Sequence, residues 1–303
     1  MSLSVVKDFT RMKRVEFSDD KGKCNTPNEI ILEQVASSIR RGLPQISPHP
    51  VNPNIALLVC GGPSLEKTEK ELREAVWRGG KLIATNGSYQ WCMDRNLKPT
   101  AMIMLDAREF NSRFVAEPVP QCRYILASQC HPKTFDLCKD REVFIWHAIT
   151  GGQPELDMVN AFYFERCYPI VLGTTVGIRA ISLLRMIGFT SIEIFGLDSC
   201  WMDDKHHSYD QPENNRDRRG EVWLRAKDRD DLAKKFLCAP WHMKQADDFM
   251  VLVKDRGDLF QLNVHGDGLL ATIIRTGAEI EMSKSLEEAV NEDQLRMPAH
   301  PTA

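Results

Sequence analysis

The sequence is short of the features that would assign a class of protein at once. Its 303 residues contain no apolar run long enough to cross a membrane, no CxxC pair and no internal repeat. Lysine plus arginine (39) and aspartate plus glutamate (42) nearly cancel, which leaves a net charge of −3. This balance gives no electrostatic reason to expect a broad nucleic-acid surface. We therefore expect neither a membrane span nor a nucleic-acid partner.

The nine cysteines are scattered singly, and no signal peptide is recognisable in the sequence. An odd number of thiols among apolar neighbours is typical of a reducing compartment. The sequence therefore predicts a cytoplasmic protein whose cysteines pack as small apolar residues. A hydrophobic content of 43% over this length is sufficient for a large core.

The stretch 55–65 joins a short apolar run to a glycine turn. Five apolar residues are too few for a helix and are typical of a buried parallel strand. The turn consists of Gly61, Gly62, Pro63 and Ser64. A helical pattern over 65–77 follows, and the N–H groups and dipole of a helix N-terminus favour an anion such as phosphate. The alternative is a plain strand-to-helix turn, because the spacing matches neither the Walker loop nor the dinucleotide fingerprint.

From residue 55 on, short apolar runs alternate with helical patterns, which is typical of an α/β sheet. Strands are expected at 55–59, 81–85, 101–105, 124–127, 143–146, 192–195 and 259–263. Helices are expected at 28–41, 65–77, 175–187 and 241–253. The predicted fold is a Rossmann-like, mostly parallel sheet flanked by helices, with a helical N-terminal extension.

The predicted organisation has three parts. Residues 1–54 form an N-terminal arm and helix, 55–282 the Rossmann-like domain, and 283–303 a C-terminal tail with a short helix. Residues 151–168 are expected to be an irregular flap over the carboxyl edge of the sheet. Residues 202–235 are densely charged, and we expect a mobile insertion or a solvated surface segment after the sixth strand.

Polar residues recur just past the carboxyl ends of the strands, the edge where open α/β sheets bind ligands. Asn86 and Gly87 follow the second strand, where the Asn86 amide can contact a ribose, base or phosphate, or simply cap the turn. Asp106 and Asp198 each close an apolar strand. Carboxylates in that position suit Mg²⁺ carrying polyphosphate, or ribose hydroxyls, and the alternative for both is helix capping.

Two further groups follow later in the chain. Gly173, Thr174 and Thr175 precede a predicted helix and form a second candidate anion site, with a capping threonine as the alternative. His206 and His207 lie in the charged segment, and adjacent residues of a strand point to opposite faces, so at most one faces the site. An imidazole suits general-base work on a hydroxyl, and the alternative is a surface pair.

Several short motifs form a recognisable series in this order. They are Cys60–Leu65, Thr85–Gly87, Met104–Asp106, Gly173–Gly177, Ile187–Phe189 and Glu193–Asp198. The series resembles the MptE-like family, named for a 6-hydroxymethylpterin diphosphokinase. More distantly, it is similar to the bacterial CMP-sialic-acid-dependent sialyltransferases. The resemblance covers about residues 55–275.

The first resemblance implies a nucleoside triphosphate on the glycine turn, with ATP·Mg²⁺ giving its terminal diphosphate to a hydroxyl acceptor. Asp106 and Asp198 would then hold the metal or orient phosphates. The second implies a nucleotide-sugar donor held by Asn86 and Thr175, with His207 or the preceding histidine deprotonating the acceptor. Those enzymes place an amide where this chain has Asp106. A carboxylate beside a phosphate needs a cation, which favours the metal-dependent interpretation.

A third interpretation is a nucleotide-binding module without turnover. The expected partners are a nucleotide and a hydroxyl-bearing small molecule or glycan, and the sequence does not distinguish between these acceptors. Zinc is not expected, because the histidine pair lacks the ligand spacing and no cysteine cluster completes a site.

Overall fold

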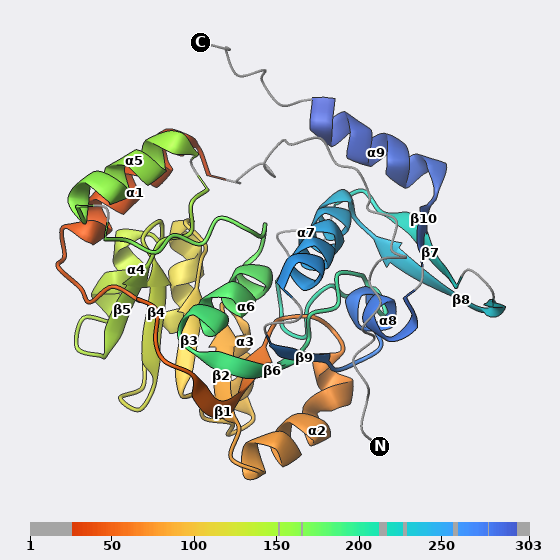
Figure 1. Cartoon of the computed structure of the whole chain (residues 1–303), viewed down its shortest axis with the longest axis horizontal. Helices are drawn as coiled ribbons and strands as arrows, with labels where there is room; N and C mark the ends of the chain where they lie inside the picture. The colour runs from red at the N-terminus through yellow and green to blue at the C-terminus, as the bar shows by residue number, and fades with distance from the viewer. Residues whose placement is uncertain are drawn as a thin grey trace.

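One parallel sheet of seven strands organises the computed structural model (Figure 1). The structure describes residues 26–295 apart from 151, 165, 212–216, 227–228, 257–259 and 278. The sheet has the order β5-β4-β3-β2-β1-β6-β9. Its strands are β1 (Asn52–Val59), β2 (Lys81–Thr85), β3 (Ala101–Met104), β4 (Arg123–Ala127), β5 (Val143–Trp146), β6 (Phe189–Phe195) and β9 (Gln261–Val264). The predicted Rossmann-like α/β fold is confirmed.

The order in which successive strands are added to the sheet changes direction at β1. Strands β2 to β5 continue on one side of β1, whereas β6 and β9 lie on the other. Right-handed crossovers therefore place the helices of the two halves on opposite faces, and the reversal leaves a crevice at the carboxyl ends of β1 and β6. The helical elements are α1 (Asn28–Ile39), α2 (Leu65–Trp77), α3 (Ser88–Asp94), η2 (Glu109–Val115), α4 (Pro132–Leu137), α5 (Gln153–Phe162), α6 (Val176–Met186), α7 (Pro240–Arg256), α8 (Leu269–Thr276) and α9 (Lys284–Leu295).

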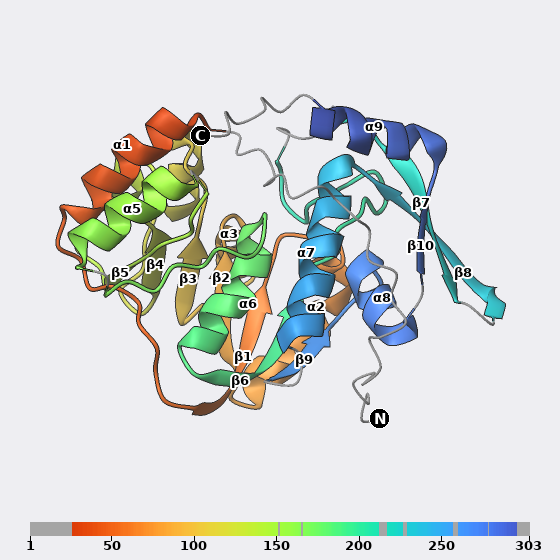
Figure 2. The ribbon, with the colours of Figure 1, turned by 45° about the horizontal axis from the view of Figure 1, so that its top comes forward.

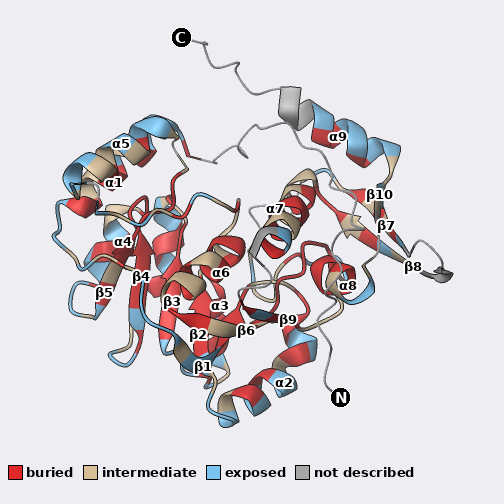
Figure 3. Ribbon diagram, viewed as in Figure 1, coloured by how far each residue is buried: buried red, intermediate tan, exposed pale blue. Residues whose placement is uncertain are grey.

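The centre of the sheet is inaccessible on both faces (Figure 3). In β1 the four residues from Ala56 to Val59 are no more than 1% exposed. Strand β1 pairs with β2 on one side and β6 on the other, and helix α6 crosses the middle strands. A strand covered in this way needs apolar residues on both faces, which is why the sequence shows a continuous apolar run instead of alternation.

The prediction of an irregular flap at 151–168 is wrong, because this stretch contains helix α5. The helix packs beside α1 (Figure 2), and Val159 joins Ile31 and Val35 of α1 and Ile145 of β5 in a second, smaller core. The helix starts with a proline in its first turn, a position that proline favours. Its sequence signal is weak because few of its apolar side chains are buried.

The charged insertion predicted at 202–235 is present, but the expectation of a mobile or solvated segment is incomplete, because the stretch contains strands. Strands β7 (Gly220–Ala226) and β8 (Arg229–Cys238) pair with β10 (Glu279–Met282) in an antiparallel sheet of order β10-β7-β8 (Figure 1). Val222 and Leu224 of β7 and Phe236 of β8 are buried. The period-two alternation is present in the sequence, but the charged residues of the other face obscure it.

The short helix predicted in the C-terminal tail is α9, and it packs on α7 and β7. Leu286 on this helix is 1% exposed, so the tail contributes to the core of the molecule. Residues 1–25 of the predicted arm and 296–303 of the predicted tail lie outside the described residues. Across the part of the chain that the structure describes, none of the helices has the length and apolar character needed to cross a bilayer.

Candidate functional site

The glycine turn after β1 binds a carboxylate of its own chain. The Ser64 N–H donates to Asp198 Oδ2 over 2.8 Å, and the Gly62 N–H donates to the Gly196 carbonyl over 2.7 Å. Pro63 has no N–H to offer. Two of the three N–H groups between residues 61 and 64 therefore have partners within the chain, and phosphate binding at this turn stays a prediction.

Asp198 is enclosed between two glycine-containing turns. It is 2% exposed, and a Cβ atom at Gly62 would lie 2.9 Å from its Cγ. A Cβ atom at Gly268, in the turn after β9, would lie 2.6 Å from its Oδ1. Burial raises the pKa of Asp198 to about 6, the hydrogen bonds from Ser64 oppose this rise, and the charge of Asp267 adds to it. The carboxylate thus joins the ends of β1, β6 and β9.

The second candidate anion site is filled in the same way. The Thr174 N–H donates to Asp248 Oδ2 of helix α7 over 2.8 Å, and Lys244 Nζ lies 2.8 Å from the other oxygen. Gly173 has a left-handed φ of 111°, and its carbonyl accepts a hydrogen bond from Arg179 over 2.6 Å. The hydroxyls of Thr174 and Thr175 are buried without a hydrogen-bond partner among the described residues.

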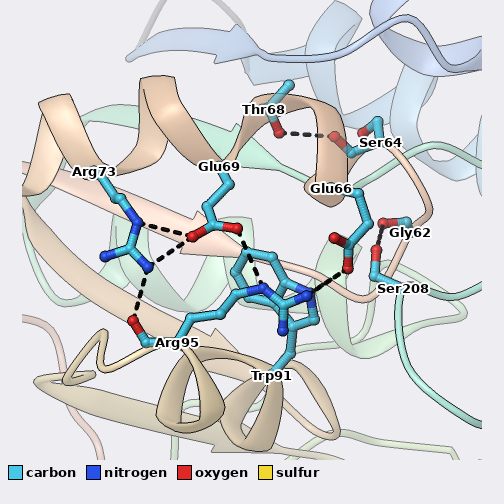
Figure 4. A network of polar contacts seen from close by, with 9 residues as sticks. All are labelled: Gly62, Ser64, Glu66, Thr68, Glu69, Arg73, Trp91, Arg95 and Ser208. Atoms are coloured by element: carbon cyan, nitrogen blue, oxygen red, sulfur yellow. Dashed lines mark hydrogen bonds and ion pairs between the residues drawn. The ribbon is translucent and has the colours of Figure 1, made fainter.

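The segment after β6 folds back over the glycine turn. The Ser208 N–H donates to the Gly61 carbonyl over 2.9 Å, and the Ser208 hydroxyl donates to the Gly62 carbonyl over 2.6 Å (Figure 4). A Cβ atom at Gly61 would lie 2.5 Å from the Tyr209 hydroxyl and 2.7 Å from His207 Cδ2. The missing side chain at this position therefore makes room for the tyrosine and the histidine.

Tyr209 also covers the second glycine turn. A Cβ atom at Gly87, after β2, would lie 2.6 Å from Tyr209 Cζ and 2.8 Å from Phe114 Cε1. The Tyr209 and Phe114 rings meet edge-on with centroids 6.2 Å apart. A phosphate cannot contact Gly61 or Gly87 while the tyrosine ring lies there, so this crevice is closed in the structure.

The two adjacent histidines have different environments. His206 is 6% exposed and lies between Trp201 and Trp241, with ring centroids 4.5 and 6.2 Å away. His207 is half-buried beside Tyr209, and its ring is nearly perpendicular to that of His206 at 86°. Burial, with a contribution from His206, lowers the pKa of His207 to about 3. His207 is therefore neutral at pH 7.

The ends of β2 and β3 are joined by Asn86, which adopts a left-handed φ of 44°. Its Oδ1 accepts a hydrogen bond from the Leu105 N–H over 3.3 Å. Asparagine tolerates this left-handed conformation better than most residues, so it suits the tight turn after β2. The side-chain oxygen of Asn86 thus has a structural role in this turn, and contact of Asn86 with a nucleotide stays a prediction.

Asp106 has a cation beside it already. Its two oxygens accept hydrogen bonds from the Arg108 guanidinium over 3.0 and 2.6 Å. Burial alone would raise the pKa of Asp106, but hydrogen bonds from the Arg108 side chain and backbone, together with its charge, outweigh burial and lower it. The guanidinium also lies over the Phe110 ring at 4.8 Å. A phosphate beside this carboxylate needs a cation, and Arg108 can supply it.

The two carboxylates that were predicted to hold metal do not lie together. Asp106 follows β3 and Asp198 follows β6, three strand positions away. At about 4.8 Å per strand, their backbones are about 14 Å apart. Within the described ranges, no three His, Cys, Asp or Glu side chains gather closely enough to hold a metal ion. The residues present do not fit one magnesium site that both carboxylates share, and a metal at either one stays a prediction.

A polar network keeps the two glycine turns in register (Figure 4). Glu66 on α2 accepts hydrogen bonds from Trp91 Nε1 of α3 over 2.9 Å and from Arg95 over 2.8 Å. Glu69, one turn further along α2, accepts from Arg95 over 3.3 Å and from Arg73 over 2.8 Å. Because α2 follows the first turn and α3 the second, this network fixes the distance between them.

Four residues of the site were not predicted from the sequence. Ser208 and Tyr209 follow the histidine pair directly, and a single aromatic residue beside polar ones in a charged segment is the only signal they give. Arg108 comes two residues after Asp106, where a basic residue close to a strand-end carboxylate indicates an ion pair. Asp248, which binds the Thr174 N–H, lies in the middle of a helix and gives no signal.

A doubly wound parallel sheet with polar groups at its carboxyl edge is a Rossmann-like architecture that binds ligands at the crevice described above. The family model for MptE-like proteins, described as "6-hydroxymethylpterin diphosphokinase MptE-like", matches residues 33–204. The chain belongs to this family. No curated protein sequence matches it.

Among solved structures, the chain is similar to the MAf glycosyltransferase from Magnetospirillum magneticum AMB-1. The TM-score is 0.54 at 12% sequence identity, and the match covers 91% of this chain and 45% of that one. The chain therefore spans less than half the length of this neighbour. At such low identity the likeness shows the shared fold.

The environment of Asp198 predicts a pH dependence of stability. Its raised pKa means that the folded chain binds this proton more tightly than the unfolded chain does. The stabilisation is fully present below about pH 3.8 and is lost as the pH rises through about 6. In Asp198→Asn, which keeps an acceptor for the Ser64 N–H, this dependence is absent. The free energy of unfolding of the variant relative to that of the parent should therefore rise by about 1–3 kcal/mol between pH 4 and pH 7, measured by denaturant unfolding.

Asp106→Asn is the matched comparison, because the pKa of Asp106 is shifted in the opposite direction to that of Asp198. The pKa of Asp106 is lowered, so its ionised form stabilises the fold at neutral pH and this stabilisation is lost as the pH falls below 3.8. Asp106→Asn should therefore lose stability relative to the parent at pH 7 and recover it in acid. If the difference in unfolding free energy between the parent and Asp198→Asn does not change with pH, this contradicts the burial of the Asp198 carboxylate.

The closed crevice predicts a coupling between Gly87 and Tyr209. Gly87→Ala places a methyl group against the tyrosine ring and should cost about 1–3 kcal/mol of unfolding free energy. In a Tyr209→Ala background the obstacle is gone, so the same substitution should cost markedly less. A double-mutant cycle by chemical denaturation should give a coupling of about 1 kcal/mol or more.

The control is the cycle of Gly42→Ala with Tyr209→Ala. Gly42 has a left-handed φ of 65°, but nothing lies within 4 Å of a Cβ atom built on it. The two effects should add within about 0.5 kcal/mol. If the Gly87 cycle is equally additive, Tyr209 does not occupy the crevice in solution.

Proposed function

We propose that the chain is a nucleotide-dependent transferase that moves a group from a nucleotide donor to a hydroxyl acceptor at the carboxyl ends of β1 and β2. The observation that carries the proposal is the position of His207. Its imidazole is neutral at pH 7 and lies against Gly61, at the edge of the sheet where Rossmann-like proteins bind ligands. A neutral imidazole can take the proton of a hydroxyl nucleophile.

The step is a displacement at the donor. The acceptor oxygen forms a bond to the transferred group while the bond between that group and the nucleotide phosphate breaks, and its electron pair leaves on the phosphate oxygen. The acceptor proton goes to a ring nitrogen of His207. A pKa near 3 makes a weak base in the free protein. The negative charge of a bound phosphate would raise this pKa toward neutrality, where general-base catalysis is most efficient.

For the donor, the arrangement of carboxylates favours a nucleotide sugar. Diphosphoryl transfer from ATP relies on divalent cations that neutralise the phosphates. In this chain Asp106 is paired with Arg108, and Asp198 is enclosed against Ser64. Asp106 therefore already has a cation beside it at the end of β3, which supports transfer without a required metal.

The second candidate is diphosphoryl transfer from ATP·Mg²⁺, and the description of the family favours it. In that case Asp106 or Asp198 would bind the cation, and Mg²⁺ would supply the charge neutralisation that Arg108 supplies in the first candidate. In both cases Tyr209 must leave its place over Gly61 and Gly87 before a phosphate reaches the glycine turns.

Nucleotide binding with and without Mg²⁺ separates the candidates. We expect a CMP-, UDP- or GDP-linked sugar to raise the melting temperature equally in Mg²⁺ and in EDTA, because Arg108 is a permanent cation. A ligand at 100 times its Kd stabilises a protein by about 2.7 kcal/mol, which a thermal-shift panel detects. Asp106→Asn removes a negative charge and releases Arg108, so it should not weaken binding in either buffer. Stabilisation by ATP alone, only in Mg²⁺ and lost in Asp106→Asn, would instead support the diphosphokinase.

His207→Ala should separate transfer from binding. A general base contributes about a hundredfold or more to the rate and little to nucleotide affinity. We therefore expect an unchanged Kd for the nucleotide and a single-turnover rate lowered by about a hundredfold or more. Because the pKa of His207 is about 3, kcat/KM of the parent should not fall between pH 7 and pH 5 as it would for a histidine of ordinary pKa.

His206→Ala is the matched control. Its ring packs between two tryptophans, so the substitution should lower stability and leave the chemical step intact. Parental transfer rates in His207→Ala would remove this residue from the mechanism. Saturable nucleotide binding by a parent that transfers to no acceptor tested would favour a binding module without turnover.

A further inference from the structure

Two neighbouring residues, Ser208 and Tyr209, cover the glycine turns and are called the latch below. The Ser208 N–H donates to the Gly61 carbonyl over 2.9 Å, and its hydroxyl donates to the Gly62 carbonyl over 2.6 Å (Figure 4). The Tyr209 ring lies where a side chain at Gly61 or Gly87 would otherwise fit. Backbone and side chain of the serine thus act together to keep the tyrosine over both turns.

The chain on either side of the latch is fixed at one place, the tryptophans Trp201 and Trp241. Before the latch, the Trp201 N–H donates to a carbonyl of β8 over 2.7 Å, and the His206 ring packs against both indoles. After the latch, Asp217 accepts a hydrogen bond from Trp241 Nε1 over 2.8 Å. The Arg219 guanidinium lies 3.4 Å from the centre of the Trp201 ring. Because both sides are fixed, the latch can move without disturbing β8 or α7.

The contacts of the latch are easier to break than those that shape the turn beneath it. Ser208 and Tyr209 are both partly exposed, so water can replace their hydrogen bonds. The turn itself is held by the Ser64 N–H on the buried Asp198 and by the Gly62 N–H on the carbonyl of residue 196. These bonds do not involve the latch. Opening therefore leaves the glycine turn in its present shape.

We infer that Ser208 and Tyr209 form an autoinhibitory latch, and that a nucleotide binds only while the latch is released. This inference rests on the proposed function, because it regulates the same donor site. His207 keeps its position beside Gly61 when the latch opens, since the preceding His206 is fixed between the tryptophans. The proposed general base is therefore present in the open form as well.

A latch of this kind changes affinity in a direction that distinguishes it from a binding contact. The apparent Kd of a ligand equals its intrinsic Kd divided by the fraction of molecules that are open. When the closed form predominates, a substitution that weakens the latch raises that fraction and so tightens binding. Removal of a side chain that contacts the nucleotide would do the opposite.

Ser208→Ala tests the inference, because it removes the hydroxyl bond to Gly62 and leaves the backbone unchanged. One hydrogen bond is equivalent to a change of about fivefold in an equilibrium constant. We therefore expect the Kd to fall about fivefold in isothermal titration calorimetry. The probes are CMP-, UDP- and GDP-linked sugars, and ATP with Mg²⁺. Equal or weaker binding by the folded variant overturns the inference.

Ser38→Ala is the matched control. Ser38 is 1% exposed, and its hydroxyl donates to the Gln34 carbonyl over 2.6 Å within helix α1, away from the glycine turns. The substitution should lower the stability of the fold and leave the Kd for the nucleotide unchanged. If Ser208→Ala fails to fold, Tyr209→Ala tests the same latch. It removes the ring from both turns and should also tighten binding, and an equal or higher Kd in that variant overturns the inference.

Amide hydrogen exchange measures the latch without any nucleotide. Residue 208 keeps its N–H in Ser208→Ala, and its protection relative to the intrinsic exchange rate should fall about fivefold. The Trp201 N–H, which is bound to β8, should keep its parental protection. Unchanged protection at residue 208 overturns the latch.

The two readouts separate this inference from the proposed function. Absence of nucleotide binding in both the parent and Ser208→Ala would refute the proposed donor site, and hydrogen exchange would then decide on the latch alone. Nucleotide binding by both proteins with the same Kd would keep the donor site and refute the latch.

Discussion

The hydrogen bond between the Ser64 N–H and the buried carboxylate of Asp198 holds the carboxyl edge of the sheet together. It joins the turn after β1 to the end of β6, and the turn after β9 closes on the other side of the same carboxylate. Because the group is 2% exposed, water does not compete for it, and glycine is required wherever a backbone passes it. The position of the crevice depends on this contact.

The same principle explains why both predicted anion turns already contact a carboxylate of the chain. A glycine turn before a helix does favour an anion, and in both cases the structure contains one. The carboxylates are Asp198 on the Ser64 N–H and Asp248 on the Thr174 N–H. Sequence spacing cannot distinguish an internal carboxylate from a ligand phosphate, because both satisfy the same N–H groups and the same dipole.

The sheet was predictable, and the surface of the site was not. Buried parallel strands such as 55–59 give continuous apolar runs, and their ends place Asp106 and Asp198 at one edge whatever the loops do. Helix α5 and strand β7 were missed because they bury few residues or carry charges on one face. Tyr209 was missed because its role depends on a contact between distant segments, which no local pattern encodes.

The central claim is that a nucleotide binds in the crevice that Tyr209 closes, beside His207. A crystal structure of the chain with a bound nucleotide tests it most directly. We predict phosphate density over Gly61 and Gly87, with the tyrosine ring moved out of the position in which it meets both glycines. A nucleotide bound elsewhere, with Tyr209 still in contact with both turns, would contradict the account.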